Sequence, residues 1–135
     1  MPTVLIVDDD VGVRKLARLV MTMEGKDVCE ASDGAEALEV LSHEAIDLMV
    51  LDLEMPRLDG KTTFREARRV GFEGPVLILS AFGARTAARE IHADDALDKP
   101  FEPDELVSHV NNLLARPDAL ALDPELADQR GDGLE

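Results

Sequence analysis

The chain of 135 residues carries 29 Asp and Glu residues against 14 Lys and Arg residues, which gives a net charge of -15. This length suits one domain with one hydrophobic core, and the negative charge disfavours direct binding to nucleic acid or to an anionic membrane. The one cysteine, Cys29, cannot form an internal disulfide, and the chain shows neither an apolar run of about 20 residues nor a signal-peptide pattern, so we expect a cytoplasmic protein.

Short apolar runs and helical patterns alternate from the start of the chain. Most of the runs lack the alternation of a half-exposed strand, which indicates strands that are covered on both faces. The first helical stretch lies between a candidate N-cap, Asp10, and a stop at Gly25. In chain order, we predict a strand at 4–7, a helix at 11–24, a strand at 27–31, a helix at 35–43, a strand at 46–51, a helix at 61–70, a strand at 75–79, a helix at 84–92, a strand at 96–98 and a helix at 103–115.

Five strands that alternate with five helices predict a doubly wound α/β fold, with a five-stranded parallel sheet and helices on both faces. The ligands of such sheets bind at the carboxyl ends of the strands. In this chain those ends carry Asp8 and Asp9 after the first strand, Asp52 after the third, Ser80 after the fourth and Lys99 after the fifth. We therefore predict that these five side chains form one site.

Three carboxylates at one edge of a sheet repel one another unless a divalent cation neutralises them. Oxygen ligands favour Mg²⁺, which proteins commonly hold through one or two carboxylates and a phosphate. A phosphoryl group at Asp52 would also need a cation and a hydrogen-bond donor, and Lys99 and Ser80 are those groups. With these groups around it, Asp52 can act as a nucleophile and form an aspartyl phosphate.

Four stretches of the sequence carry these residues in a distinctive order. They are Val-Leu-Ile-Val-Asp-Asp-Asp at 4–10, Asp-Leu-Met-Val-Leu-Asp-Leu-Glu-Met-Pro at 47–56 with Asp-Gly at 59–60, Leu-Ile-Leu-Ser-Ala at 77–81, and Asp-Lys-Pro-Phe at 98–101. Together they resemble the receiver domain of bacterial two-component response regulators, and the resemblance covers residues 3–116. It implies a flavodoxin-like sheet with the strand order 2-1-3-4-5.

The resemblance also implies a role for each acid of the site. Asp52 corresponds to the phospho-acceptor, which takes a phosphoryl group from a histidine kinase or a phosphotransfer protein. Asp8, Asp9, Asp52 and the backbone carbonyl of Glu54 correspond to the groups that bind Mg²⁺.

The positions around the phosphoryl group can be matched in the same way. Ser80, Ala81 and Lys99 correspond to residues that bind the phosphoryl group, and the family has a cis bond before the proline that follows the lysine. Glu54 and Phe82 correspond to variable positions that tune the lifetime of the phosphate.

Two departures from the family bear on the switch. Ala96 stands at a switch position where the family usually has Tyr or Phe, whose ring turns inward as the residue at the Ser80 position moves to the phosphate. Ser80 and Lys99 are 19 positions apart, which is about three fewer than is typical of the family and corresponds to roughly one helical turn. We therefore expect a shortened fourth helix and an atypical switch, although another side chain that fills the space at Ala96 would leave the switch unchanged.

We expect a receiver domain over residues 1–116 and a disordered acidic tail at 117–135, which holds six acids and one Arg. Since no output domain follows residue 116, we expect signalling through contact with a protein partner, with a homodimer left open. The domain turns over no external substrate in this interpretation, so we do not expect an enzyme. The alternatives are a phosphorylation-independent interaction module and, with less support, a Mg²⁺-dependent phosphohydrolase that uses Asp52.

The remaining titratable residues have no predicted role in the site. We interpret Asp94 and Asp95 as loop acids and place Asp98 outside the site. Three histidines on separate predicted helices are expected to be solvated rather than to bind a metal: His43, His92 and His109.

Overall fold

The predicted alternation of strands and helices is confirmed in a computed structural model that describes residues 1–55 and 58–115. The elements are β1 (Thr3–Val7), α1 (Val11–Met23), β2 (Asp27–Ala31), α2 (Gly34–His43), β3 (Leu48–Asp52), α3 (Gly60–Arg69), β4 (Val76–Ser80), α4 (Ala84–Ile91), β5 (Asp95–Asp98) and α5 (Pro103–Ala115). The predicted acidic tail at 117–135 lies outside the described residues.

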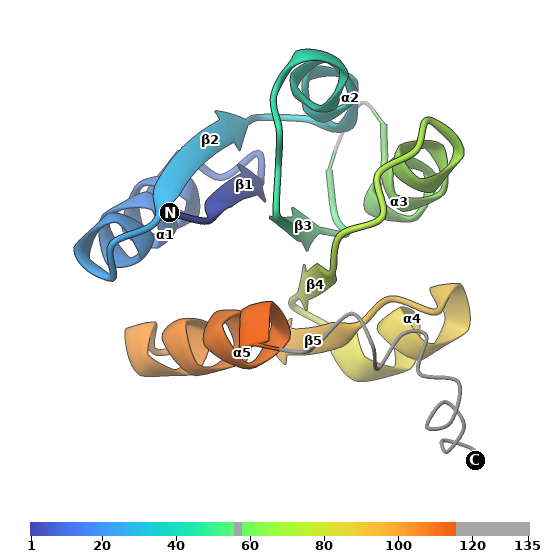
Figure 1. The fold of residues 1–135 in the computed structure, drawn as a ribbon. Helices are drawn as coiled ribbons and strands as arrows, with labels where there is room; N and C mark the ends of the chain where they lie inside the picture. The colour runs from blue at the N-terminus through green and yellow to red at the C-terminus, as the bar shows by residue number, and fades with distance from the viewer. Residues whose placement is uncertain (56–57, 116–135) are drawn as a thin grey trace, which may run out of the picture.

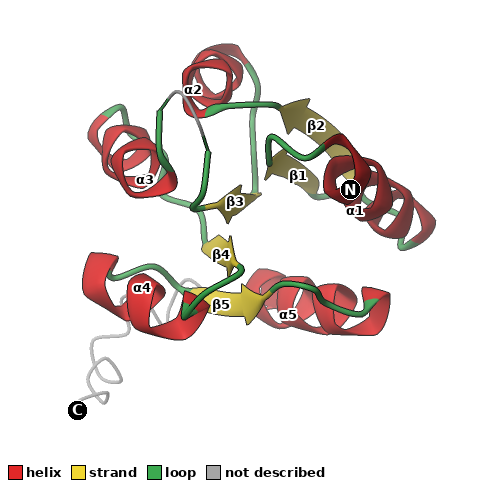
Figure 2. Cartoon of the chain, turned by 180° about the vertical axis from the view of Figure 1, so that it is seen from behind, coloured by secondary structure: helices red, strands yellow, loops and turns green. Residues whose placement is uncertain are grey.

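The strands of the described chain form one parallel sheet in the order β2-β1-β3-β4-β5, as predicted (Figure 1). Helices α1 and α5 cover one face of the sheet, and α2, α3 and α4 cover the other (Figure 2). Every strand is parallel to its neighbours, so each connection crosses over through a helix. As a result, the carboxyl ends of all five strands lie at the same edge of the sheet.

The side chains of β3 alternate between two hydrophobic cores. Leu48 and Val50 pack with residues of α1 and α5, while Met49 and Leu51 pack with residues of α2, α3 and α4. All residues of β3 and β4 are buried. Burial on both faces explains why these strands appear in the sequence as continuous apolar runs.

Three of the helices have an aspartate as their N-cap residue. Asp10 Oδ1 accepts hydrogen bonds from the backbone N–H groups of Gly12 at 2.8 Å and Val13 at 3.2 Å, so the predicted cap of α1 is confirmed. Asp33 and Asp59 cap α2 and α3 in the same way. With these caps in place, α2 and α3 begin one residue earlier than predicted.

Helix α4 is the shortest helix in the described part of the chain, with 8 residues against 13 in α1 and α5. It begins after Gly83, whose φ of 64° is left-handed, and Asp98 Oδ1 accepts a hydrogen bond from the backbone N–H of Ala84 at 3.2 Å. The side chain of Asp98 therefore caps this helix. Within residues 1–55 and 58–115, no helix has the length and apolar character needed to cross a membrane.

His109 belongs to no candidate metal group in the described residues, but it is paired rather than simply solvated. Its Nδ1 atom lies 2.7 Å from Asp95 Oδ2, and its side chain is only partly exposed. Asp95 is also not a loop acid, because it is the first residue of β5. The pair links α5 to the start of the edge strand β5. It therefore lies at the end of the sheet opposite the predicted site and has a structural role.

Gly60, the first residue of α3, lies against the backbone that follows β3. Its N–H donates a hydrogen bond to the carbonyl oxygen of Leu53 at 3.2 Å. A Cβ atom at this position would lie 2.5 Å from Leu53 Cα and 2.6 Å from the carbonyl oxygen of Asp52. No side chain fits there, so Gly60 is required for the close approach of α3 to the end of β3.

We therefore expect Gly60→Ala to destabilise the fold by about 1–3 kcal/mol, because backbone atoms must shift to accept the methyl group. The matched control is Gly12→Ala in the first turn of α1. There the nearest atom to the added Cβ is a side-chain oxygen of Asp10 at 3.2 Å, so the change should stay within about 1 kcal/mol. Urea unfolding followed by circular dichroism measures both, and equal effects would contradict the steric role of Gly60.

Candidate functional site

Asp8 and Asp9 follow directly after β1 and take different environments. The N–H of Asp8 donates to the carbonyl oxygen of Ala31 at 3.1 Å, which continues the pairing with β2 by one residue. Its side chain is fully buried, and its Oδ1 atom accepts a hydrogen bond from the N–H of Asp10 at 2.9 Å. Asp9 is exposed. The turn between β1 and α1 thus buries one carboxylate at the edge of the sheet and leaves the next accessible.

Asp52 is the last residue of β3, and 1% of its surface is exposed. Its Oδ1 atom accepts a hydrogen bond from the N–H of Glu54 at 3.2 Å. The pairing with β4 continues past it, because the N–H of Leu53 donates to the carbonyl oxygen of Leu79 at 3.0 Å. These bonds hold the carboxylate at the carboxyl edge of the sheet, where it was predicted.

Lys99 joins the two buried carboxylates. Its Nζ atom lies 2.9 Å from Asp8 Oδ2 and 3.2 Å from Asp52 Oδ1. Its backbone N–H donates to the carbonyl oxygen of Ser80 at 2.9 Å, which fixes the start of the loop after β5 beside the end of β4. The bond between Lys99 and Pro100 is cis, as the resemblance implies. The structure thus brings residues from four strand ends together.

Carboxylate oxygens of Asp8, Asp9 and Asp52 lie within 4.8 Å of one another, so they could share one cation. The Oδ2 atom of Asp52 is buried and accepts no hydrogen bond from residues 1–55 or 58–115. An unpaired carboxylate oxygen in the interior is costly unless a cation or a donor satisfies it. Three oxygen donors and an unsatisfied oxygen fit the coordination preferences of Mg²⁺.

Burial has the largest single effect on the pKa values of Asp52 and Lys99. Burial and the neighbouring charge of Asp8 raise the pKa of Asp52 to about 7, although Lys99 and the N–H of Glu54 act in the opposite direction. Burial lowers the pKa of Lys99, but its contacts with Asp8 and Asp52 outweigh burial and hold that pKa above its usual value. Lys99 is therefore a permanent cation, whereas Asp52 titrates near neutrality in the absence of a metal ion.

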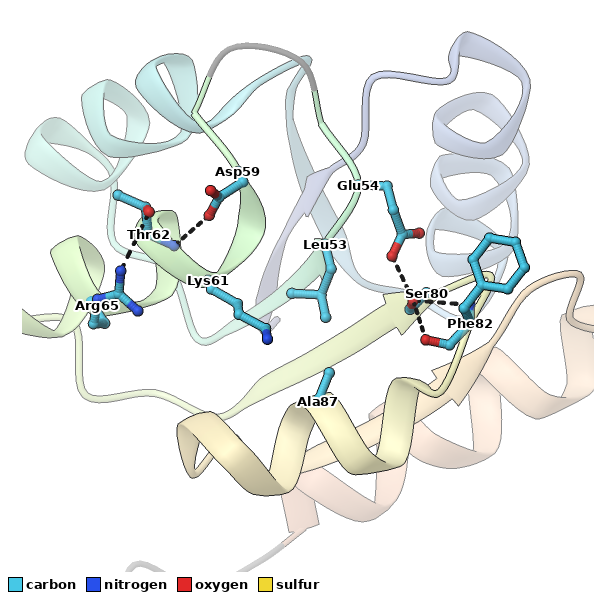
Figure 3. A pocket seen from close by; sticks show the side chains of 9 residues that line it. All are labelled: Leu53, Glu54, Asp59, Lys61, Thr62, Arg65, Ser80, Phe82 and Ala87. Atoms are coloured by element: carbon cyan, nitrogen blue, oxygen red, sulfur yellow. Dashed lines mark hydrogen bonds between the residues drawn. The ribbon is translucent and has the colours of Figure 1, made fainter.

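Ser80, the last residue of β4, is buried, and its hydroxyl contacts Glu54 and Phe82 and also accepts a hydrogen bond from the N–H of Phe82 at 3.1 Å. Its Oγ atom lies 2.6 Å from Glu54 Oε2 and 3.1 Å from the carbonyl oxygen of Phe82 (Figure 3). The N–H of Ala81 donates to Glu54 Oε1 at 3.1 Å. The Glu54 carboxylate therefore binds two of the three residues that were predicted to bind a phosphoryl group, Ser80 and Ala81. The sequence analysis predicted that Glu54 binds Mg²⁺ through its backbone carbonyl and tunes the lifetime of the phosphate. It did not predict the contact of its side chain with Ser80 and Ala81.

Ala96 lies apart from the carboxylates. It lies on the edge strand β5, pairs with Ile78 of β4 and is 4% exposed. It also lines a small hollow of about 150 Å³ between α4 and β5, together with Ala88 and Ala93 and with charged residues. No aromatic ring lines this hollow within the described residues. Phe82 is instead 83% exposed beside Ser80.

Because the ionised form of Asp52 is disfavoured by burial, Asp52→Asn should stabilise the metal-free fold by about 1–3 kcal/mol at pH 8. A raised pKa means that the native state holds a proton which the unfolded state loses at lower pH. Stability from this residue is therefore present below about pH 4 and is lost as the pH rises through about 7.

The gain from Asp52→Asn should accordingly grow between pH 5 and pH 8. Urea unfolding in the presence of a chelator measures it. Asp27→Asn, at an exposed aspartate at the opposite end of the sheet, is the matched control. A gain that is the same at both pH values would contradict the raised pKa of Asp52.

Comparison with known proteins agrees with this arrangement. The family model described as "Response regulator receiver domain" matches residues 4–111. Response regulator MprA of Mycobacterium leprae is 42% identical over 116 residues, and MprA of Mycobacterium ulcerans is 41% identical over 116 residues. These alignments cover 84% of this chain and 51% and 50% of the relatives. The chain thus spans about half the length of the curated relatives it matches.

Solved structures show the same similarity in three dimensions. The receiver domain of the Francisella response regulator 1452 is 36% identical with a TM-score of 0.78, and the match covers 84% of this chain and 97% of that chain. TrrA of Thermotoga maritima, in complex with Mg²⁺ and BeF, is 32% identical with a TM-score of 0.76, and the match covers 84% and 99%. The fold, the motifs and these matches agree, and the chain belongs to the response regulator receiver domain family of two-component systems.

Proposed function

We propose that this receiver domain accepts a phosphoryl group on Asp52 from the phosphohistidine of a histidine kinase or a phosphotransfer protein. The observation that carries the proposal is the buried Asp52 carboxylate, whose Oδ1 pairs with Lys99 and whose Oδ2 has no hydrogen-bond partner in the described chain. A carboxylate in this state is poised to gain a bond to an electrophile, and its cationic neighbour offsets the charge that arrives.

In the transfer, an oxygen of Asp52 bonds to phosphorus as the P–N bond of the phosphohistidine breaks, and the imidazole nitrogen keeps the electron pair. Asp8, Asp9, Asp52 and the backbone carbonyl of Glu54 would hold Mg²⁺, whose charge offsets that of the carboxylates and of the incoming phosphoryl oxygens. The complex of TrrA with Mg²⁺ and BeF supports this assignment, since TrrA is 32% identical to this chain.

Three groups would bind the phosphoryl oxygens after transfer. The ammonium of Lys99 would supply positive charge, while Ser80 Oγ and the backbone N–H of Ala81 would donate hydrogen bonds. Asp52 pairs with Leu79 of the neighbouring strand β4. Ser80 and Ala81 come directly after Leu79 in the chain, so both donors lie next to Asp52. Phe82 and Glu54 lie beside them and would tune the lifetime of the phosphate.

We further propose that the switch is atypical. A small hollow borders Ala96, no aromatic ring lines it within the described residues, and α4 is short. A movement of Ser80 toward the phosphate would therefore be transmitted without an aromatic partner at this position. The domain, assigned to residues 1–116, would signal through contact with a protein partner and would turn over no external substrate.

Incubation with acetyl phosphate and Mg²⁺ tests the proposal by intact-mass spectrometry. We expect the mass to increase by one phosphoryl group, with the acid stability and base lability of an acyl phosphate. The increase should be absent from Asp52→Asn, because the amide cannot act as the nucleophile, and absent after chelation of Mg²⁺. Asp27→Asn should be modified like the wild type, since that exposed residue lies at the opposite end of the sheet.

Two results would contradict this function. A mass increase that persists in Asp52→Asn would place the acceptor elsewhere, and no increase with any small donor or phosphohistidine protein would favour the phosphorylation-independent interaction module. Steady release of phosphate from small phosphoesters would instead favour a phosphohydrolase.

A further inference from the structure

The side chain of Glu54 occupies a second anion-binding position next to Asp52. Its two carboxylate oxygens each accept one hydrogen bond, from Ser80 Oγ at 2.6 Å and from the N–H of Ala81 at 3.1 Å (Figure 3). These are bonds to a charged acceptor, which are shorter and stronger than bonds between neutral groups. The donors at the end of β4 are therefore already satisfied by an anion of the chain itself.

Each of these donors can serve only one strong acceptor at a time. The hydroxyl of Ser80 has a single proton, and the backbone N–H of Ala81 has a single proton. The hydroxyl already lies close to a second acceptor, the carbonyl oxygen of Phe82 at 3.1 Å. A phosphoryl group on Asp52 that bonds to both donors must consequently displace the Glu54 carboxylate from both.

We propose that the Glu54 carboxylate is an internal competitor of the phosphoryl group for Ser80 Oγ and the Ala81 N–H. This inference rests on the proposed function and states the direction in which Glu54 acts. The carboxylate holds the donors in the unphosphorylated domain, weakens the binding of a phosphoryl group at Asp52, and has to leave before the end of β4 can close on the phosphate. The two states of the site thus differ in which anion the donors bind.

The structure provides space for the displaced side chain. Glu54 and Ser80 line a pocket of about 370 Å³ that extends between α3 and α4. Lys61 and Arg65 line the same pocket from α3, so cationic groups border the space into which the carboxylate can move. Glu54 is already exposed, so its displacement does not bring a buried charge into solvent.

Binding of beryllofluoride in the presence of Mg²⁺ tests the proposal, because this anion mimics a phosphoryl group without being transferred. We expect Glu54→Ala to bind beryllofluoride about tenfold more tightly than the wild type. In the wild type the ligand must first break the hydrogen bonds of the Glu54 carboxylate, and the variant has no such bonds to break. Glu54→Gln keeps an acceptor but no charge and should lie between the two. The matched control is Glu39→Ala, which removes the same charge from an exposed position on α2 and should leave the affinity unchanged.

Competition for a donor can be separated from simple charge repulsion by a double-mutant cycle with Ser80→Ala. If Glu54 acts through the hydroxyl, the gain from Glu54→Ala should shrink severalfold in the Ser80→Ala background. The amide proton signal of Ala81, followed by nuclear magnetic resonance, should move upfield in Glu54→Ala before any ligand is added, because the bond to the carboxylate is lost.

The inference is overturned if Glu54→Ala binds beryllofluoride no more tightly than the wild type, or if its gain is the same with and without the Ser80 hydroxyl. Either result leaves the proposed function intact, provided that the wild type binds beryllofluoride at Asp52. If neither the wild type nor Glu54→Ala binds it, while a circular dichroism spectrum shows that both are folded, the proposed function itself fails.

Discussion

The ammonium of Lys99, held between the buried carboxylates of Asp8 and Asp52, is the interaction on which the rest of the site depends. Burial of either carboxylate alone would be costly, and distances of 2.9 and 3.2 Å show that one ammonium serves both. One positive charge cannot balance these two carboxylates and that of Asp9 as well. The site therefore retains excess negative charge, which favours a divalent cation. Burial, together with the charge of Asp8, raises the pKa of Asp52 to about 7.

Backbone hydrogen bonds that extend three of the strand pairs, β1–β2, β3–β4 and β4–β5, hold these charged residues at the carboxyl edge of the sheet. The N–H groups of Asp8, Leu53 and Lys99 each donate to a neighbouring strand end, so the site residues share the rigidity of the sheet. Position in the turn then determines the role of each acid. Asp8 is buried against Lys99, whereas Asp10, two residues later, caps α1. Gly60 completes the arrangement by allowing α3 to approach the end of β3.

Much of this could be predicted from the sequence, for a physical reason. A strand buried on both faces appears as an unbroken apolar run, so the polar residue that ends the run marks the edge of the sheet, as Asp52 and Ser80 do. The contacts of Glu54 and His109 could not be predicted, because they depend on side-chain rotamers and on the packing of elements distant in sequence. A glutamate two residues after a strand can point to solvent or turn back, and only the position of β4 decides between the two.

A crystal structure of the domain with Mg²⁺ and beryllofluoride would test the central claim most directly, because it reports the ligands of both groups at once. The account predicts beryllium bonded to an oxygen of Asp52, Mg²⁺ bound by Asp8, Asp9 and Asp52, and fluorine atoms in contact with Lys99, Ser80 Oγ and the Ala81 N–H, with Glu54 displaced from these donors. Beryllofluoride bound away from Asp52, with the ion pairs of Lys99 unchanged and no metal ion between the aspartates, would contradict it.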